Sequence, residues 1–303
     1  MAMEVNRYHK ELRECLKPWW EYPKPEPPPK LIIFVAPTGI SIRREQNPAQ
    51  PYAPEEIAEE TYRAYKAGAV GVHIHARRDD GTATSDPELF GKIIDLVRQR
   101  CPDIIIECSC LTGETLEATL KPFEDKRVEM TALELGSFNS REHVYIISNT
   151  EIMARGEYFK EQGIKPWLVV MQSGWPKQAK DLLIEPGLVD KPYLWEPCFG
   201  MQDCTPFSVA NYVHLRQTLP PDSLAMALGC GRCALDVTVT GIVLGDHVRV
   251  GMEDALYRVG HKDVKVKSNE ELVKRAVEVA NILEREIATP DEARRMLGIK
   301  PRR

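Results

Sequence analysis

The sequence predicts a (β/α)₈ barrel preceded by a proline-rich extension, and three observations support this prediction. Eight short apolar runs follow residue 30, longer helical patterns separate them, and two histidines stand at the end of the second run. Strands that are apolar almost throughout are typical of parallel sheets with a core on one side and helices on the other. Eight strand–helix units within about 270 residues favour one closed barrel over the alternative, an open doubly wound sheet.

We expect residues 1–30 to form an extension outside the barrel domain, which would span residues 31–303. The segment PKPEPPPK at 23–30 predicts a stiff, extended lead-in. The residues before it favour a short helix. Because the whole extension is charged and proline-rich, it does not have the composition of a signal peptide.

The eight expected strands are short runs of mostly aliphatic and aromatic residues. No GxGxxG segment follows the first of them, which disfavours a dinucleotide-binding sheet. The expected strands are Leu31–Ala36, Val70–His75, Asp103–Ser109, Met130–Leu135, Trp167–Met171, Tyr193–Phe199, Ser223–Gly229 and His247–Gly251.

Helical patterns fill the segments between these strands. Pro54 is expected to begin the first barrel helix, since proline fits the first turn. The segment 85–101 has an acidic start, a basic end and an apolar stripe, which predicts an amphipathic helix. The last long helix is expected over 268–286, where Ser268 with Glu271 fits a capping box.

Composition excludes some classes of function. The chain has 303 residues and a formal net charge of -5, with acidic and basic residues mixed along it. This balance gives no electrostatic reason to expect binding to nucleic acid or to an anionic membrane. No apolar run approaches the roughly 20 residues of a membrane span. We therefore expect a cytoplasmic enzyme with small-molecule substrates.

Eight cysteines raise the question of a metal site or a disulfide framework. Cys230 and Cys233 have CxxC spacing, but a structural zinc site normally needs a second such pair, and Cys108 and Cys110 are spaced differently. In a long chain without a signal peptide, reduced thiols in the core are the stronger interpretation.

The segment GVHIHARRDDG at 71–81 carries the strongest functional signal. Residues two apart on a strand point the same way, about 6.6 Å apart, so His73 and His75 would converge on one ion at the strand end. The carboxyl ends of barrel strands carry the active site, and neutral imidazole is a common metal ligand. The alternative is two histidines that only form local hydrogen bonds.

A catalytic metal site usually needs a third protein ligand and one open position. The other histidines do not pair at ligand spacing, so a carboxylate after the eighth expected strand is the best candidate. Glu253 and Asp254 follow that strand directly. The alternative is an acidic first turn of a helix, which the helix dipole favours in any case. Metal-dependent amidohydrolases carry HxH on the first strand and Claisen-type synthases carry it late in the chain, so neither pattern fits.

A set of short motifs at successive strand ends resembles the β-keto acid cleavage enzymes from about Leu31 to the C-terminus. The motifs are Thr38-Gly39, HIH at 73–75 followed by Arg77 and DDG, Ser109, Gly231-Arg232 and HVRVGMED at 247–254. The resemblance implies a (β/α)₈ barrel, a homotetramer and one divalent metal, typically zinc. It also implies a retro-Claisen exchange, in which a β-keto acid and acetyl-CoA give acetoacetate and a new acyl-CoA.

The same resemblance implies roles for individual residues. The metal ligands would be His73, His75 and Glu253. Asp254 would move protons, Arg249 would hold it and lower its pKa, and Ser109 would hydrogen-bond a developing oxyanion. The metal would act as a Lewis acid on the keto and carboxylate oxygens of the substrate.

Ligand contacts are expected at two further places. Gly229, Gly231 and Arg232 suit the phosphates of coenzyme A, because glycines expose backbone N–H groups near a helix start and the arginine adds charge. The alternative there is a plain glycine turn. The substrate contacts implied by the resemblance are Thr38, Ser41 and Glu134.

The chain departs from the family's pattern where an amino-keto substrate would bind. Ser41 stands in place of a glutamate that holds the substrate ammonium, Ala132 replaces a threonine, and Glu134 replaces a neutral amide. The loop FGMQDCTP at 199–206 also differs. 3-Keto-5-aminohexanoate is therefore a poor candidate substrate for this chain.

Three expected strand glutamates need partners if they face inward: Glu107, Glu134 and Glu196. Barrel arginines or lysines are the simpler partners, and a cationic substrate tail near Glu134 is the alternative. The overall prediction is a zinc-dependent acyltransferase acting on a β-keto acid and acetyl-CoA. Its rivals are a metal-dependent hydrolase or aldolase that uses no coenzyme A, and a metal-stabilised barrel that binds a ligand without turnover.

Overall fold

The computed structural model describes residues 2–109, 111, 115–140 and 143–300, and its centre is a closed barrel of parallel strands in the order β1-β12-β11-β10-β9-β6-β5-β2. The expected fold class and all eight expected strands are confirmed. The barrel strands are β1 (Ile33–Val35), β2 (Gly71–Ile74), β5 (Ile105–Cys108), β6 (Met130–Glu134), β9 (Lys165–Val170), β10 (Tyr193–Phe199), β11 (Ser223–Gly229) and β12 (His247–Val250).

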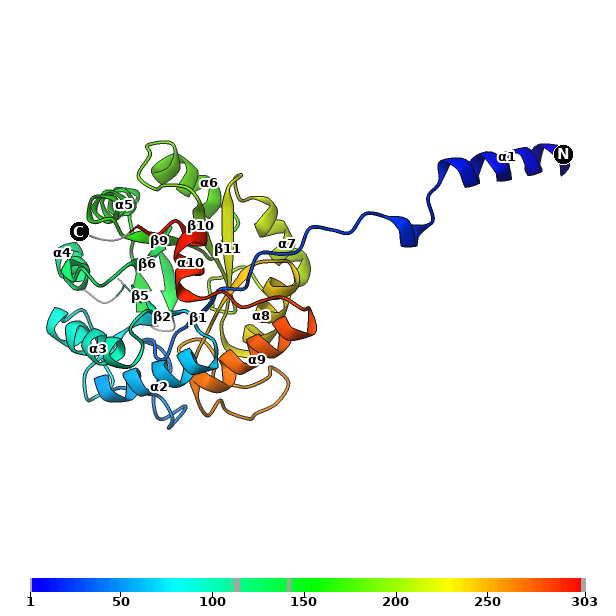
Figure 1. Cartoon of the computed structure of the whole chain (residues 1–303). Helices are drawn as coiled ribbons and strands as arrows, with labels where there is room; N and C mark the ends of the chain where they lie inside the picture. Colours follow the sequence, from blue (N-terminus) through cyan, green and yellow to red (C-terminus); the bar gives the residue numbers. More distant parts are fainter. Residues whose placement is uncertain (1, 110, 112–114, 141–142, 301–303) are drawn as a thin grey trace.

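Helices surround the barrel (Figure 1). Pro54 begins α2 and Ser268 caps α9, as expected, but the Glu271 carboxylate accepts a hydrogen bond from the backbone of Lys267 and so does not complete a capping box. Helix α9 also ends four residues before the expected 286, at Ile282. The surrounding helices are α2 (Pro54–Ala67), α3 (Pro87–Arg100), α4 (Leu116–Leu120), α5 (Asn149–Gln162), α6 (Trp175–Ala179), α7 (Val209–Gln217), α8 (Ala234–Val243) and α9 (Asn269–Ile282).

Two short hairpins were not expected from the sequence. The first pairs β3 (Ala76–Arg77) with β4 (Ala83–Thr84), and the second pairs β7 (Phe138–Ser140) with β8 (His143–Tyr145). The Arg77 side chain donates hydrogen bonds to the carbonyls of Gly81 and Ile42, so it ties the first hairpin to the loop that follows β1. These strands are too short for a periodic pattern to reveal them.

Helix α10 (Pro290–Leu297) closes the amino-terminal end of the barrel, where it lies across the strands (Figure 1). Its start is a full capping box formed by Thr289 and Glu292. Ala293 and Leu297 are fully buried and belong to the same core cluster as barrel residues such as Trp167. With α10 and the buried core closing this end, the barrel interior opens to a ligand at the carboxyl ends of the strands, where the largest part of the polar lining lies.

The polarity of the barrel interior changes along the barrel axis. Its lower part is an apolar plug that includes Phe34, Met130 and Trp167. Gly71 makes room for this plug, because a Cβ there would come within 2.4 Å of the Phe34 ring. Above the plug several inward positions carry ionisable side chains, including His73, Glu196 and Arg249, so the fold brings charged groups together at the open end.

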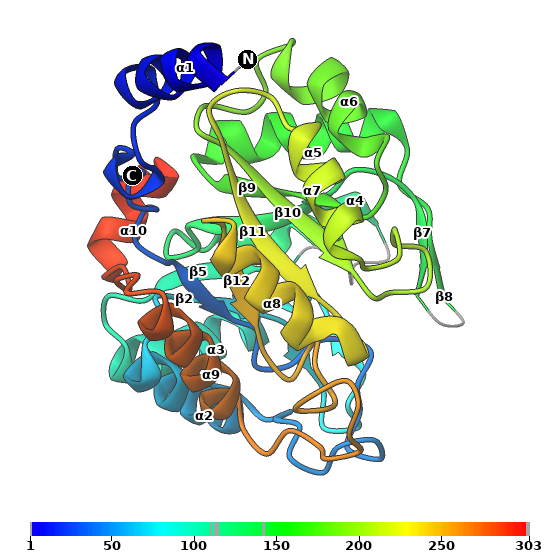
Figure 2. The same cartoon turned by 90° about the vertical axis from the view of Figure 1, so that its right-hand side faces the viewer.

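The N-terminal extension lies outside the barrel (Figures 1 and 2). Helix α1 (Ala2–Cys15) projects away from the body at the end of an extended segment that contains the short helix Trp19–Glu21. The side chains of Trp19 and Trp20 are exposed. No helix among the described residues is both long and apolar enough to cross a membrane.

The seal formed by α10 predicts a loss of stability when it is weakened. Leu297→Ala is expected to lower the free energy of unfolding by about 2–5 kcal/mol, because it removes a fully buried side chain and leaves a cavity. The measurement is the shift of the urea unfolding midpoint. The exposed neighbour Arg295 provides the control, since Arg295→Ala should change stability by less than about 0.5 kcal/mol. Equal midpoints for Leu297→Ala and the unmodified chain would contradict this role of α10.

Candidate metal centre

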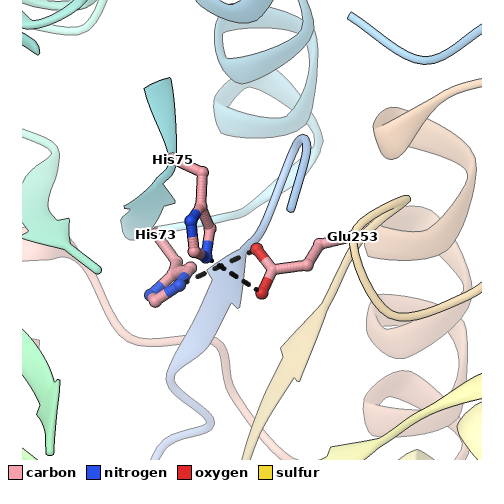
Figure 3. A group of neighbouring side chains, drawn as sticks. All are labelled: His73, His75 and Glu253. Atoms are coloured by element: carbon pink, nitrogen blue, oxygen red, sulfur yellow. Dashed lines mark ion pairs between the residues drawn. The ribbon is translucent and has the colours of Figure 1, made fainter. Parts of the chain in front are cut away.

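Three side chains converge at the open end of the barrel (Figure 3). His73 lies on β2 and His75 comes directly after this strand. Glu253 comes from the loop after β12, and β12 is separated from β2 by a single strand, β1. Their ligand atoms all lie within 4.8 Å of one another. Among the described residues no other group of three or more His, Cys, Asp or Glu side chains approaches so closely. The structure therefore brings together the three ligands expected from the sequence.

The spacing of these atoms fits a metal ion better than direct hydrogen bonds. His73 Nε2 is 3.7 Å from Glu253 Oε2, and His75 Nε2 is 3.4 Å from Glu253 Oε1. Ligands around a tetrahedral zinc ion at bond lengths of about 2.0–2.2 Å lie about 3.3–3.6 Å apart. Glu253 Oε2 is buried and accepts no hydrogen bond, so this oxygen is available to coordinate a cation.

A second carboxylate fixes the orientation of one ligand. His73 Nδ1 and Glu107 Oε1 share a hydrogen bond of 2.7 Å, and both side chains are buried. With Nδ1 engaged on this side, Nε2 is the ring nitrogen that faces Glu253. A carboxylate behind a histidine ligand is the usual support of a metal site. This gives Glu107 a structural reason to be buried on β5.

The ionisation of the three ligands suits metal binding. Burial, with the nearby Arg249 charge, lowers the pKa of His73 to about 3, and burial also lowers the pKa of His75. Both imidazoles are therefore neutral. Burial alone would raise the pKa of Glu253, but Arg249 and the histidines hold it well below its ordinary value, so this carboxylate is charged.

Glycines and distant polar residues position the loop of Glu253. A Cβ on Gly39 would lie 2.2 Å from Glu253 Cγ, so the glycine of the Thr38-Gly39 motif leaves room for this carboxylate. Gln50 donates to the Met252 carbonyl and Asn269 accepts from the Met252 N–H. Gln50 lies in the loop after β1 and Asn269 is the first residue of α9, and neither was singled out in the sequence because no motif connects them to this site.

Arg249 is the central cation of the site. It is buried on β12 and donates two hydrogen bonds to Asp254, at 3.1 and 3.0 Å, and one to Glu253 at 2.5 Å. Glu196 on β10 lies 3.6 Å away on the other side. Arg249 lowers the pKa of Asp254, as expected, but burial outweighs it and raises this pKa to about 7. The expected contact between Arg249 and Asp254 is confirmed.

A cavity of about 380 Å³ opens above these groups. The residues predicted to be functional that line it are His73, His75, Ser109, Ser41, Glu134, Gly231, Arg232, Arg249, Glu253 and Asp254. Thr38 and Gly229 are not part of this lining. The Thr38 hydroxyl donates to Gln50, and a Cβ on Gly229 would collide with the start of α8, so this glycine permits close packing of α8 on β11.

Two of the predicted contact residues have protein partners. Arg232 donates to Asp263 and to the Gly260 carbonyl, and its guanidinium lies 4.2 Å from the centre of the Tyr257 ring. Both members of the Arg232–Asp263 pair are largely exposed, so this ion pair is weak and a ligand phosphate could replace it. Ser41 Oγ lies 3.5 Å from Ser140 Oγ across the cavity mouth.

Glu134 faces an arginine from outside the barrel. Arg155 on α5 is buried, and its Nη1 lies 3.9 Å from Glu134 Oε2, while its Nη2 donates to Glu151. Burial raises the pKa of Glu134 to about 7, and Arg155 works against that rise. The simpler of the two expectations, a barrel arginine as partner, is confirmed for Glu196, which lies beside Arg249, whereas the arginine beside Glu134 comes from helix α5.

The cysteines do not form a second metal group among the described residues. The seven cysteines in the described part of the chain form no disulfide, and four of them are buried as expected: Cys101, Cys108, Cys198 and Cys204. Cys15 is exposed, and Cys230 and Cys233 are half-buried, so the expectation of core thiols is wrong for these three. Cys110 lies outside the described residues.

Comparison with known proteins relates this chain to enzymes that act on β-keto acids. The family model described as beta-keto acid cleavage enzyme matches residues 30–299. The chain is 39% identical over 274 residues to the 3-keto-5-aminohexanoate cleavage enzyme of Fusobacterium nucleatum, covering 89% of this chain and 98% of the relative. It is 30% identical over 271 residues to the 3-oxoadipate:acetyl-CoA acetyltransferase of Cupriavidus necator, covering 88% and 94%.

Solved structures support the fold. The apo structure of ObcA superposes with a TM-score of 0.68 at 21% identity, covering 83% of this chain and 66% of that chain. At this level of identity the similarity concerns the barrel architecture alone.

The contact between Glu107 and His73 predicts a specific effect on metal binding. Glu107→Leu removes the acceptor behind the ligand and is expected to weaken metal affinity by about 10–100-fold. Glu107→Gln keeps an acceptor of the same shape and should retain most of the affinity. The measurement is competition with a chelator of known affinity, with circular dichroism as a check on folding. If Glu107→Leu binds metal as tightly as the unmodified chain, the hydrogen bond does not support the site.

Proposed function

Since the chain belongs to the beta-keto acid cleavage enzyme family, we propose that it catalyses a metal-dependent acyl exchange between a β-keto acid and acetyl-CoA. The observation that carries this proposal is the position of the His73, His75 and Glu253 group, which faces the cavity directly beside the Arg249–Asp254 pair. The name of the Cupriavidus necator relative contains acetyl-CoA, which supports the choice of co-substrate.

The proposed reaction breaks one carbon–carbon bond and one thioester and forms one bond of each kind. The bond between C2 and C3 of the β-keto acid breaks, and the acetyl group of acetyl-CoA joins C2 to give acetoacetate. The coenzyme A thiolate, released from the acetyl group, takes the acyl fragment that contained C3. Atoms balance without an oxidant or a reductant, since the products are acetoacetate and a new acyl-CoA.

The proposed roles follow from the positions of the side chains. Asp254 would accept the proton from C2, since it is buried beside the metal ligands and its pKa of about 7 suits a base at neutral pH. Arg249 would hold Asp254 in place through two hydrogen bonds. Ser109, which is buried in the cavity wall after β5, would donate a hydrogen bond to an oxygen of the substrate.

The metal is proposed to be zinc or another divalent ion held by His73, His75 and Glu253. Two imidazoles and one carboxylate are the donor set of many catalytic zinc sites, and the buried unpartnered oxygen of Glu253 fits a cation. When bound, the ion would supply Lewis acidity toward the keto oxygen.

Coenzyme A is proposed to enter beside the start of α8. Gly231 and Arg232 line the cavity there, and Gly231 has a positive φ of 63°, which favours glycine. The Arg232 guanidinium lies at the surface within reach of a phosphate that displaces Asp263. A boundary after residue 30, a homotetramer and a cytoplasmic location stay predictions.

A direct assay tests the reaction class. Metal-loaded protein incubated with acetyl-CoA and a β-keto acid is expected to form a new acyl-CoA, detected by mass spectrometry, and a chelator should abolish the product. Cleavage that does not require acetyl-CoA would instead favour the metal-dependent hydrolase or aldolase. Metal binding without any turnover would favour the barrel that acts only as a binding protein.

The proposed base predicts a separate result. Asp254→Asn is expected to lower kcat by about 10²–10⁴-fold, because the side chain can no longer accept a proton, while metal affinity changes little. The exposed Asp79 provides the control, and Asp79→Asn should leave kcat unchanged. Full activity in Asp254→Asn would exclude this aspartate as the base.

A further inference from the structure

The ring of strands determines which wall of the cavity a metal-bound substrate faces. The metal ligands come from β2 and from the loop after β12. In the barrel order β10 lies opposite β2, and β6 lies opposite β12. A β-keto acid held at the ligands through its keto and carboxylate oxygens would therefore direct its acyl chain toward β6, β9 and β10.

Apart from Glu134 and Glu196, this opposite wall is apolar. Its apolar inward side chains are Ala132 on β6, Val169 on β9, Met171 just after β9 and Cys198 on β10, with Phe138 and Met201 above them, and all line the cavity. Apolar contact of this kind stabilises hydrocarbon and gives no compensation for the desolvation of a charge.

Among the described residues, no arginine or lysine of β6, β9 or β10 lines the cavity, so an acidic acyl chain would find no cationic partner on this wall. The arginines that line the described part of the cavity are Arg249 and Arg232. Arg249 already contacts three carboxylates: Glu196, Glu253 and Asp254. Arg232 lies at the mouth, after β11, and pairs with Asp263. A second substrate carboxylate against the β6–β10 wall would instead meet Glu134 and Glu196.

A cationic acyl chain would have to compete with a residue of the protein. Glu134 is the carboxylate at the end of β6, and the buried Arg155 lies behind it at 3.9 Å. On the β1 side of the mouth, Ser41 is paired with Ser140 and carries no charge. A substrate ammonium at the end of this wall would therefore have to share Glu134 with Arg155.

We infer that the substrate is a β-keto acid with an uncharged, apolar acyl chain, bound by the wall of Ala132, Val169, Met171 and Cys198. This inference rests on the proposed acyl exchange and specifies its substrate class. It separates the chain from relatives whose names specify 3-keto-5-aminohexanoate or 3-oxoadipate, which carry an amino group or a second carboxylate.

Three β-keto acids with six carbons each test the inference: 3-oxohexanoate, 3-keto-5-aminohexanoate and 3-oxoadipate. Metal-loaded protein with acetyl-CoA is expected to use 3-oxohexanoate with a kcat/KM at least about tenfold above either charged compound, and to form butanoyl-CoA. A higher kcat/KM for a charged compound would overturn the inference and leave the acyl exchange intact.

Calorimetric titration of the metal-loaded protein with the same three acids separates the two proposals. If no acyl-CoA forms from any acid, the proposed exchange is wrong. Tighter binding of 3-oxohexanoate would still support the apolar wall in that case, and tighter binding of a charged acid would overturn it.

A pair of neighbouring valines on β9 tests the wall itself. Val169→Ala enlarges the cavity and is expected to shift the preference from 3-oxohexanoate toward the longer 3-oxooctanoate by about fourfold for each methylene group it accommodates. The side chain of Val170 points to the opposite face of the sheet, away from the cavity, and is fully buried. Val170→Ala loses the same side-chain volume and should leave the chain-length preference unchanged. An unchanged preference in Val169→Ala, or an equal shift in Val170→Ala, would show that this wall does not bind the acyl chain.

Discussion

The guanidinium of Arg249 is the charge around which the open end of the barrel is organised. It contacts Glu196, Glu253 and Asp254 from one position on β12. Burial alone would lower the pKa of Arg249, but these carboxylates hold it well above its ordinary value. A buried charge is tolerated only when it is paired, so the acidic residues and this arginine require one another.

The acidic residues around Arg249 differ in the direction of their pKa shifts. Glu253, which it contacts at 2.5 Å, stays charged and suits a metal ligand. Burial prevails at Glu107 and raises its pKa to about 8, and it raises the pKa of Asp254 to about 7. Neighbouring carboxyl groups with different pKa values are typical of active sites, where one group binds and another moves protons.

The local sequence explains how such a group is assembled on a rigid frame. Gly39 leaves the space that Glu253 occupies, and a Cβ on Gly251 would lie 2.0 Å from the Ala36 carbonyl oxygen, so this glycine lets the chain after β12 pass close to β1. The helix α10 seals the far end with an apolar plug beneath the charges. These features leave a single open end and direct the metal ligands into its cavity.

The sequence by itself determined the barrel, its eight strands and the two histidines at its open end, because apolar runs and the HxH spacing act over a few residues; Glu253 was identified through the resemblance to a family. Only the tertiary structure decided that Arg155 on α5 faces Glu134, that Glu107 lies behind His73, and that the wall opposite the candidate metal site is mostly apolar. These facts depend on which strands lie opposite each other when the sheet closes. No spacing along the chain contains that information.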